Sequence, residues 1–296
     1  MKTQVHQRPT PNLNRRAFLQ GTTLMLTCPG MVLGKSQEVV RVGLVTDIHY
    51  ADKNTGGSRH YRDSKLKLRE AVSHFNKEKP AFVIELGDFI DRAKDVETEL
   101  QYLKVIEKEY SQLQCDRYYV LGNHCLDTLS KEEFIANTGM DAPHYSFDKG
   151  GFHFVALDAC FNSKGEPYQR RNFVWNDANI SDEQLKWLEQ DLRSSGKPTV
   201  VFTHQRLDPS GNYMIKNAEA VRNIMEKAGN VQAVFSGHSH KNEHKIFNGI
   251  HYCVVRAVVE GPGEDNNGYG MLSLHCDGKL AIEGFRKQKD YSFSDA

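Results

Sequence analysis

The hydrophobic pattern along this 296-residue chain limits its fold more than any other feature. Short apolar runs alternate with longer amphipathic stretches, which is typical of an α/β protein. The apolar runs predict eight strands, at Val39–Val45, Ala81–Leu86, Arg117–Leu121, Phe152–Leu157, Thr199–Thr203, Val231–Phe235, His251–Val255 and Tyr269–His275. The amphipathic stretches predict five helices, at Ser64–Lys79, Val96–Leu113, Lys131–Asn137, Ser181–Leu192 and Asn217–Ala228.

Few signals along the chain divide these elements into separate units. We find no internal repeat and no linker rich in proline, glycine or serine, so residues 38–288 are expected to form one domain. The stretch Phe161–Asn179 predicts one long irregular segment, and segments of that length inside a domain are commonly functional. Ser181 and Gln184 form a capping-box pattern, in which Gln184 is expected to reach back to the start of the helix.

The first 34 residues predict an export signal. Arg15 and Arg16 are followed by Phe18 and Leu19 and then by the apolar run Leu24–Leu33, which resembles a bacterial twin-arginine signal peptide. The run is shorter than the roughly 20 residues that span a membrane, so no stable membrane span is expected. We therefore expect recognition by the twin-arginine export machinery and a periplasmic or extracellular location. A basic tail and a short membrane anchor are the alternatives.

The charge of the remaining chain argues against one class of partner. Four of the 38 basic residues lie in the first 34 residues, which contain no acid, so the rest carries a net charge of −4. A mildly acidic protein provides no electrostatic attraction for a nucleic acid polymer, and none is expected as a partner.

Residues that can bind metals follow five of the predicted strands. They are Asp47 and His49, then Asp88 and Asp91, then Asn123 and His124, then His204, and finally His238 and His240. Ligands of open α/β sheets gather at the carboxyl ends of strands, so these side chains are expected to meet. Asp-x-His and His-x-His each place two side chains on the same side of an extended segment, where both can reach one ion.

These residue types suit a pair of divalent cations. Two such ions roughly 3.5–4 Å apart can hold a hydroxide and polarise a phosphoryl oxygen. They need oxygen and imidazole ligands, with one carboxylate between them. Manganese, iron and zinc all accept such ligands, and the residue types do not decide among them.

The order and content of the five motifs resemble the calcineurin-like metallophosphoesterases from Val42 to about Phe285. The resemblance implies a four-layer α/β/β/α sandwich of two mixed sheets flanked by helices. It also implies seven metal ligands, with Asp88 bridging: Asp47, His49, Asp88 and His240 for one ion, and Asp88, Asn123, His204 and His238 for the other. By the same resemblance, His124 stabilises or protonates the departing oxygen, and Asp91 orients His124.

Cys125 departs from this family pattern, because an acid commonly follows Gly-Asn-His. One interpretation is a small buried residue that the site tolerates, and a second is a thiol near the metals that is sensitive to oxidation. A third hypothesis, from another functional class, is a metal-loaded protein that binds phosphate esters without turnover. Restoring an acid at Cys125 would distinguish this last hypothesis from an enzyme.

A second resemblance concerns the substrate. The stretches Gly57–Arg62, Asn179–Leu188 and Val259–Gly261 are similar to the manganese-dependent ADP-ribose/CDP-alcohol diphosphatase branch. This resemblance implies manganese and attack of a metal-bridging hydroxide on one phosphorus of a diphosphate. Arg62 is the first candidate to clamp the other phosphate, because a guanidinium binds phosphate through two parallel hydrogen bonds.

Two further residues of this region, Arg59 and Tyr61, are additional substrate-binding candidates. Tyr61 and Trp175 are among the aromatic residues that could stack on a nucleobase. A phosphomonoesterase and a cyclic-nucleotide phosphodiesterase are the alternative activities.

Overall fold

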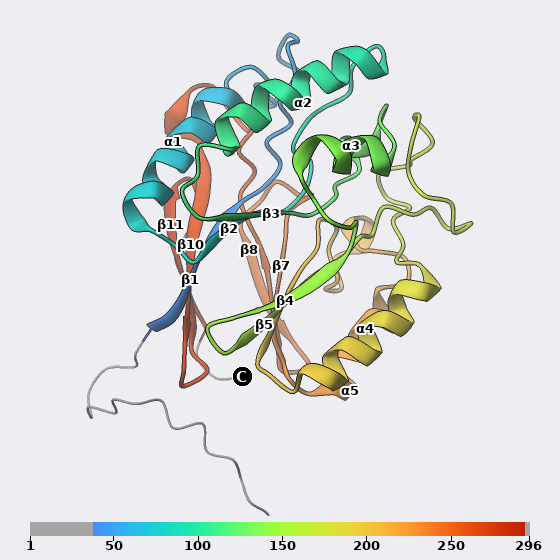
Figure 1. Ribbon diagram of the computed structural model, residues 1–296, viewed down its shortest axis with the longest axis vertical. Helices are drawn as coiled ribbons and strands as arrows, with labels where there is room; N and C mark the ends of the chain where they lie inside the picture. The colour runs from blue at the N-terminus through green and yellow to red at the C-terminus, as the bar shows by residue number, and fades with distance from the viewer. Residues whose placement is uncertain (1–37, 294–296) are drawn as a thin grey trace, which may run out of the picture. The chain divides into compact units, whose positions relative to one another are not determined.

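A computed structural model describes residues 38–293 of the chain (Figure 1). The predicted export signal at residues 1–34 lies outside the described residues. Within residues 38–293, no helix combines the length and the apolar character needed to cross a membrane.

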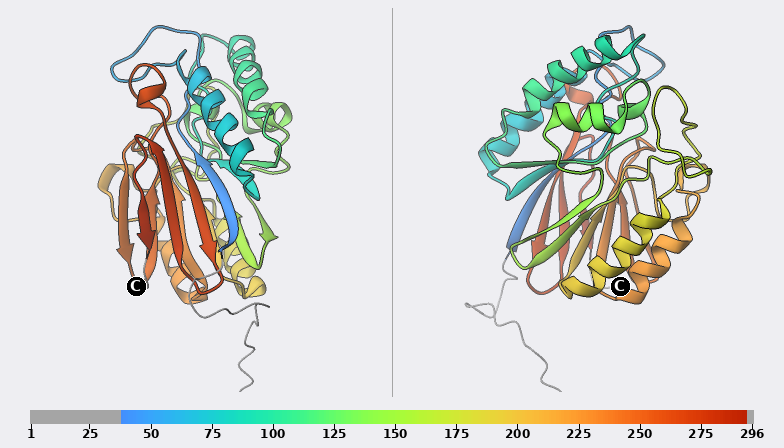
Figure 2. Two further views of the ribbon diagram at one scale, coloured as in Figure 1. Left: turned by 90° about the vertical axis from the view of Figure 1, so that its left-hand side faces the viewer. Right: turned by 45° about the vertical axis from the view of Figure 1, so that its right-hand side comes forward.

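Twelve strands of the described chain form two six-stranded mixed sheets. The first sheet has the order β12 (Tyr291–Phe293), β11 (Leu280–Arg286), β10 (Gly268–His275), β1 (Glu38–Val45), β2 (Phe82–Glu85) and β3 (Asp116–Tyr119). The second has the order β4 (Tyr145–Lys149), β5 (Phe152–Ala156), β6 (Thr199–Phe202), β7 (Val231–Ser236), β9 (Ile250–Val254) and β8 (Glu243–Phe247). β1 pairs in parallel with β2 and antiparallel with β10, so the first and last parts of the domain lie side by side (Figure 2).

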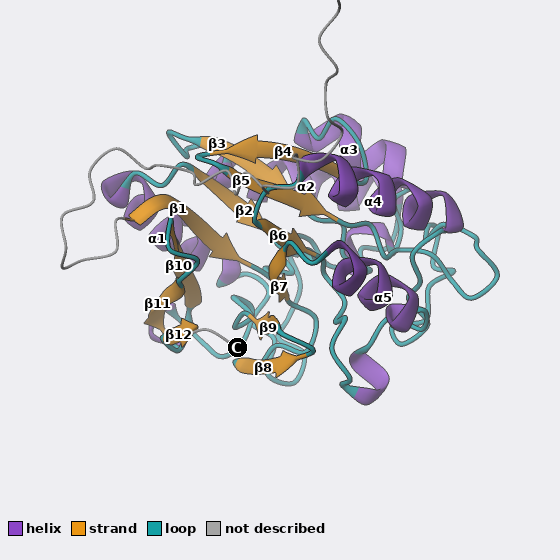
Figure 3. Ribbon diagram, turned by 90° about the horizontal axis from the view of Figure 1, so that it is seen from below, coloured by secondary structure: helices purple, strands orange, loops and turns teal. Residues whose placement is uncertain are grey.

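Five helices cover the outer faces of the sheets. Side chains of α1 (Ser64–Glu78), α2 (Val96–Tyr110) and α3 (Lys131–Thr138) share one apolar cluster with the first sheet. Side chains of α4 (Asp182–Ser195) and α5 (Ala218–Ala228) share another with the second sheet, and both helices lie on one side of the strands (Figure 3).

A third apolar cluster lies between the two sheets. Val42 and Leu44 of β1 point into it and pack with Phe154 and Phe202 of the facing sheet, whereas Val45 belongs to the cluster under the helices. This division follows from the two-residue period of a strand, which sends successive side chains to opposite faces. The predicted four-layer α/β/β/α sandwich is confirmed.

The eight predicted strands and five predicted helices are all present, with ends within three residues of those expected. The prediction omitted four strands: β4, β8, β11 and β12. Three of them, β4, β8 and β12, are the edges of their sheets, and their exposed polar residues interrupt any apolar run.

One helix start differs from the prediction. The Ser181 hydroxyl accepts a hydrogen bond from the Gln184 backbone N–H, as expected. The Gln184 side chain does not reach back, however, because its amide exchanges two hydrogen bonds with the backbone of Asp158. A complete capping box lies instead at Ser130 and Glu133, at the start of α3.

Candidate metal centre

The turns that follow β1 and β7 bring together a first cluster of metal-capable atoms. Asp47 Oδ1 lies 3.2 Å from His240 Nε2 and 3.6 Å from His49 Nε2. The Nε2 atoms of His49 and His240 are 3.2 Å apart. Three donor atoms at these spacings surround a position that one cation can occupy.

A second cluster forms where the turns after β2, β6 and β7 meet. Asp88 Oδ2 lies 3.1 Å from His204 Nε2, which in turn lies 3.2 Å from His238 Nδ1. Asp88 and His204 are almost completely buried, and His238 is buried with them. These three side chains are a second group that can hold an ion.

One oxygen atom connects the two clusters. Asp88 Oδ2, which contacts His204, is also 3.4 Å from His49 Nε2 of the first cluster. A carboxylate oxygen that belongs to both groups has the position required of a bridging ligand.

The hydrogen bonds on the outer side of the histidines test whether cations fit this site. Nδ1 of His49 lies 2.8 Å from Asp91 Oδ2, and Nδ1 of His240 lies 2.6 Å from Glu260 Oε1. Because both acceptors are carboxylates, each Nδ1 carries a proton, and the Nε2 atoms of the two rings face each other at 3.2 Å. Two ring nitrogens this close need a proton or a cation between them, so the residues fit a metal ion.

His204 repeats this arrangement in the second cluster. Its Nδ1 donates to the backbone carbonyl of Leu86 at 2.9 Å, which leaves Nε2 facing Asp88. The second cluster therefore also presents ring nitrogens and a carboxylate oxygen to a common position.

Both carboxylates of the clusters are anionic. Burial alone would raise the pKa of Asp47 and of Asp88, but neighbouring histidines hold both pKa values below the ordinary range. For Asp47 the largest favourable contribution comes from His240, and for Asp88 it comes from His204. Buried anions of this kind require compensating positive charge.

The backbone of the site is strained. Five of the seven predicted ligands have a left-handed backbone with φ between 46° and 68°: Asp47, His49, Asp88, His238 and His240. Such conformations cost non-glycine residues roughly 1–3 kcal/mol each and concentrate at functional sites.

Two glycines allow the turns to approach closely. A Cβ at Gly122 would lie 2.2 Å from the Asp88 backbone nitrogen, and a Cβ at Gly237 would lie 2.3 Å from Asp47 Oδ2.

Asn123 and His124 border the clusters. The Asn123 amide is buried and lines a cavity that lies over the two clusters. Its oxygen accepts a hydrogen bond from Gln205 Nε2 at 3.4 Å. The backbone N–H of His124 donates to Asp88 Oδ1 at 2.7 Å, which holds both the bridging carboxylate and the His124 turn in place.

Asp91 lies between two histidines. Its Oδ2 is hydrogen-bonded to His49, and the same atom is 3.5 Å from His124 Nδ1, which has no hydrogen bond. Burial lowers the pKa of His124, but the charges of Asp88 and Asp91 outweigh it and raise the pKa above its ordinary value. The predicted Asp91–His124 proximity is present, and the stronger contact of Asp91 is with His49.

The three predicted substrate-binding residues lie in different surroundings. Arg59 lines the cavity, and its guanidinium is 3.4 Å from Asp91 Oδ2. Arg62 does not line the cavity, and its exposed guanidinium pairs instead with Asp52 and Asn54. The ring of Tyr61 is buried beneath the ammonium of Lys53, 4.1 Å from its centroid. The geometry therefore favours Arg59 over Arg62 as a contact of the substrate.

The cavity over the two clusters has a volume of about 720 Å³. Besides Arg59, its basic side chains include Lys53 and Arg256, and its aromatic side chains are Phe173, Trp175 and Tyr213. Two charged side chains of the site are not among the residues predicted from the sequence. The acidic one is Glu260, which is hydrogen-bonded to His240, and the basic one is Lys53, which binds Asp91. Glu260 lies within the stretch Val259–Gly261, which is similar to the diphosphatase branch, but only the fold brings it to His240.

Cys125 lies under the centre, away from the cavity. It is completely buried, and its sulfur accepts a hydrogen bond from the Phe89 backbone N–H at 3.4 Å. Burial raises the pKa of the thiol well above its ordinary value, which disfavours the reactive thiolate. These surroundings favour a small buried residue over an oxidation-sensitive thiol.

Replacing Glu260 by glutamine is expected to weaken the binding of one metal ion. The change removes the charged acceptor that orients His240, and loss of such a partner typically costs 10–100-fold in metal affinity. Titration with Mn²⁺, followed by the electron paramagnetic resonance of the free ion, measures the affinity. Glu264→Gln is the matched control, because Glu264 is exposed in the same loop and should bind Mn²⁺ as the unmodified chain does. Equal affinities for the two variants would contradict the role of Glu260.

The two packed sheets and the shared Asp88 define a metallophosphoesterase. The chain belongs to the calcineurin-like phosphoesterases, whose family model matches residues 40–242. It is accordingly a hydrolase that acts on phosphate esters.

Two known proteins and one solved structure are similar to this chain over most of its length. The manganese-dependent ADP-ribose/CDP-alcohol diphosphatase of Arabidopsis thaliana is 26% identical, covering 88% of this chain and 98% of that protein. The serine/threonine-protein phosphatase CPPED1 of Danio rerio is also 26% identical, covering 78% of this chain and 77% of that protein. The crystal structure of a dimetal phosphatase from Danio rerio superposes with a TM-score of 0.78 at 22% identity, covering 88% of this chain and all of that one.

Proposed function

We propose that this protein uses two divalent ions, with manganese preferred, to hydrolyse the diphosphate bond of a nucleoside diphosphate ester of the ADP-ribose or CDP-alcohol type. The observation that supports two ions is the position of Asp88 Oδ2 between His49 and His204. The similarity to the diphosphatase of Arabidopsis thaliana, which extends over nearly its whole length, supports the substrate class and the metal.

Each ion would be held by its own cluster. Asp47, His49 and His240 would hold one, and His204, His238 and Asn123 the other, with Asp88 common to both. Bound ions of this kind supply a hydroxide nucleophile and polarise the phosphoryl group.

The other residues act on the substrate directly. His124, whose pKa is raised, would protonate the oxygen that leaves phosphorus. Arg59, on the same side of the cavity as Asp91, would neutralise the phosphate that departs. A diphosphate suits this pair of residues, because its leaving group carries negative charge.

A panel of substrates tests this proposal. With Mn²⁺, ADP-ribose and CDP-choline should be hydrolysed with much higher kcat/KM than an aryl phosphate or cyclic AMP. Preference for the aryl phosphate or cyclic AMP would replace the diphosphatase proposal with a phosphomonoesterase or a cyclic-nucleotide phosphodiesterase. Binding of two metals without turnover of any substrate would favour the non-catalytic binding protein.

The two arginines give a matched pair of variants. Arg59→Met is expected to lower kcat/KM for ADP-ribose by about 10²-fold, since it removes a charge-assisted contact with phosphate. It should affect an aryl phosphate much less, because that substrate has no second phosphate. Arg62→Met is expected to have nearly the same kcat/KM as the unmodified chain, since the Arg62 guanidinium binds Asp52 outside the cavity. If Arg62→Met lost diphosphatase activity and Arg59→Met kept it, the assignment from the sequence would replace the one from the geometry.

We also propose that the protein is exported by the twin-arginine pathway, on the basis of Arg15 and Arg16 and the apolar run after them. The variant with lysine at both positions should accumulate inside bacterial cells, whereas the unmodified chain should be found in the periplasmic or extracellular fraction. Cell fractionation and immunoblotting measure the distribution. Equal export of both forms would contradict the proposal.

A further inference from the structure

Two exposed aromatic side chains lie at the rim of the cavity. Trp175 is 43% exposed and Tyr213 is 38% exposed. Within residues 38–293, five large hydrophobic side chains are exposed, and Val174, Trp175 and Tyr213 are three of them. Both aromatic residues line the cavity over the candidate metal centre.

The two rings come from separate irregular segments and meet beside one predicted ligand. Trp175 belongs to the long segment at residues 161–179, and Tyr213 ends the short 3-10 helix Gly211–Tyr213 that follows β6. Their ring centroids are 5.5 Å apart, and they lie 6.1 Å and 5.8 Å from the centroid of His238. The fold thus holds an apolar surface at the edge of the second cluster.

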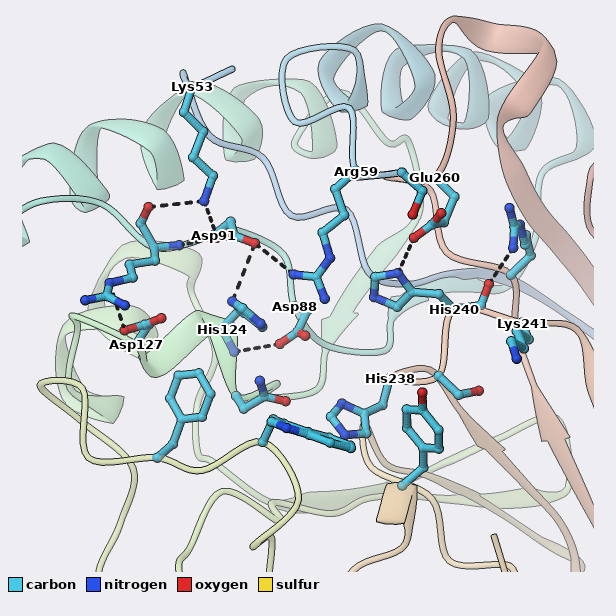
Figure 4. Close-up of a pocket in the computed structure, with 18 residues that line it drawn as sticks. Lys53, Arg59, Asp88, Asp91, His124, Asp127, His238, His240, Lys241 and Glu260 are labelled. Carbon is cyan, nitrogen blue, oxygen red and sulfur yellow. Dashed lines mark hydrogen bonds and ion pairs between the residues drawn. The ribbon is translucent and has the colours of Figure 1, made fainter. Parts of the chain in front are cut away.

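The opposite part of the cavity has a different character. Lys53 and Arg59 both contact Asp91, next to His124, and Figure 4 shows them across the cavity from His238. A ligand that extends over both clusters would therefore meet positive charge at one end and aromatic faces at the other. A nucleotide has matching parts, a phosphate group and a planar base.

The spacing of the rings decides how a base would bind. A base inserted between two rings needs about 7 Å, twice a stacking distance of about 3.5 Å. The rings of Trp175 and Tyr213 are closer than this and are inclined by 50°. A base would therefore stack on the free face of the Trp175 indole, with Tyr213 supporting the indole.

We propose that Trp175 and Tyr213 form the base-binding platform of this site, and that the ligand carries a nucleobase on the His238 side. The proposal rests on the proposed function for the identity of the substrate, but the binding of a nucleoside monophosphate can be tested without turnover. It also gives the segment at residues 161–179 a role in substrate selection.

The tryptophan content of the chain allows a direct test. The sequence has two tryptophans, Trp175 and Trp187. Trp187 lies on α4 and packs against His144. In the Trp187→Phe variant, fluorescence therefore reports on Trp175 alone. AMP, ribose 5-phosphate and inorganic phosphate are titrated into this variant in the presence of Mn²⁺, and calorimetry measures binding independently.

The platform predicts that AMP changes the Trp175 emission, whereas ribose 5-phosphate and phosphate bind without changing it. Trp175→Ala, measured by calorimetry, should bind AMP between about fivefold and about 150-fold more weakly, which is the range for losing one base–aromatic stack. Its affinity for ribose 5-phosphate should stay unchanged, which separates a lost stack from a misfolded protein.

Three results would overturn the platform. They are equal emission changes with AMP and ribose 5-phosphate, unchanged AMP affinity in Trp175→Ala, and absence of AMP binding. If AMP binds through Trp175 but no diphosphate is hydrolysed, the platform stands and the proposed function fails. If diphosphates are hydrolysed and Trp175→Ala has no effect, the proposed function stands and the platform fails.

Discussion

Replacement of Asp88 by asparagine is expected to reduce the metal content from two ions per chain to one or none and to lower kcat/KM by at least about 10³-fold. The amide keeps the size of the side chain and can still accept the hydrogen bond from the His124 backbone. It loses the negative charge of the one oxygen that contacts both clusters. Metal content is measured by elemental analysis of protein that has been dialysed against Mn²⁺ and freed of excess ion.

Asp127→Asn is the matched control for metal content. Asp127 is also a buried carboxylate at the cavity, but it belongs to neither cluster. This variant should retain two ions, and the thermal melting of both variants shows that they are folded. Two ions bound with unchanged affinity in Asp88→Asn, together with normal turnover, would rule out a bridging role for Asp88.

Replacement of His124 by alanine is expected to leave both metals bound and to lower kcat by about 10²–10⁴-fold on a diphosphate, which is the usual contribution of a general acid. His124 is not a member of the cluster formed by Asp47, His49 and His240, nor of that formed by Asp88, His204 and His238, although it forms a third group of metal-capable side chains with His49 and Asp91. Its side chain is partly exposed to the cavity, where a leaving oxygen can reach it.

The leaving group distinguishes a proton donor from a structural residue. A 4-nitrophenolate departs without protonation, so the loss in His124→Ala should be much smaller on a 4-nitrophenyl ester than on the matching phenyl ester, whose leaving phenolate is far more basic. His144→Ala is a control, since His144 packs against Trp187 away from the cavity. Equal losses on the two substrates, or loss of a metal ion, would show that His124 acts through the structure of the site.

The sequence predicts the clustering of the site well because strand direction determines it. Asp47 and Asp88 follow parallel strands of the first sheet, and His204 and His238 follow parallel strands of the second, so each pair lies at the carboxyl edge of its own sheet. Apolar runs identify these strands because both of their faces are covered, by helices on one side and by the facing sheet on the other.

Side-chain direction in the loops is what the sequence could not predict. Arg59 and Arg62 are three residues apart in one irregular segment, and no periodicity tells which of them faces the cavity. Local competition decides, because Asp52 and Asn54 bind Arg62 outside it. The sequence also does not predict which side chains bind the metal ligands. Glu260 is 20 residues from His240 along the chain and reaches it only through the turn after β9.

The edge strands show a related limit. β8 reads Glu-His-Lys-Ile-Phe and is half exposed, so its sequence lacks an apolar run even though it pairs along its length with β9. Its pairing depends on the neighbouring strand, which a local pattern does not contain.

The central claim is that one carboxylate oxygen holds two metal ions, and anomalous diffraction from crystals grown with Mn²⁺ tests it most directly. We expect two anomalous peaks, one within bonding distance of Asp47, His49 and His240 and the other within bonding distance of His204 and His238, with Asp88 Oδ2 bonded to both. A single peak at full Mn²⁺ saturation, or two peaks of which Asp88 contacts only one, would contradict it.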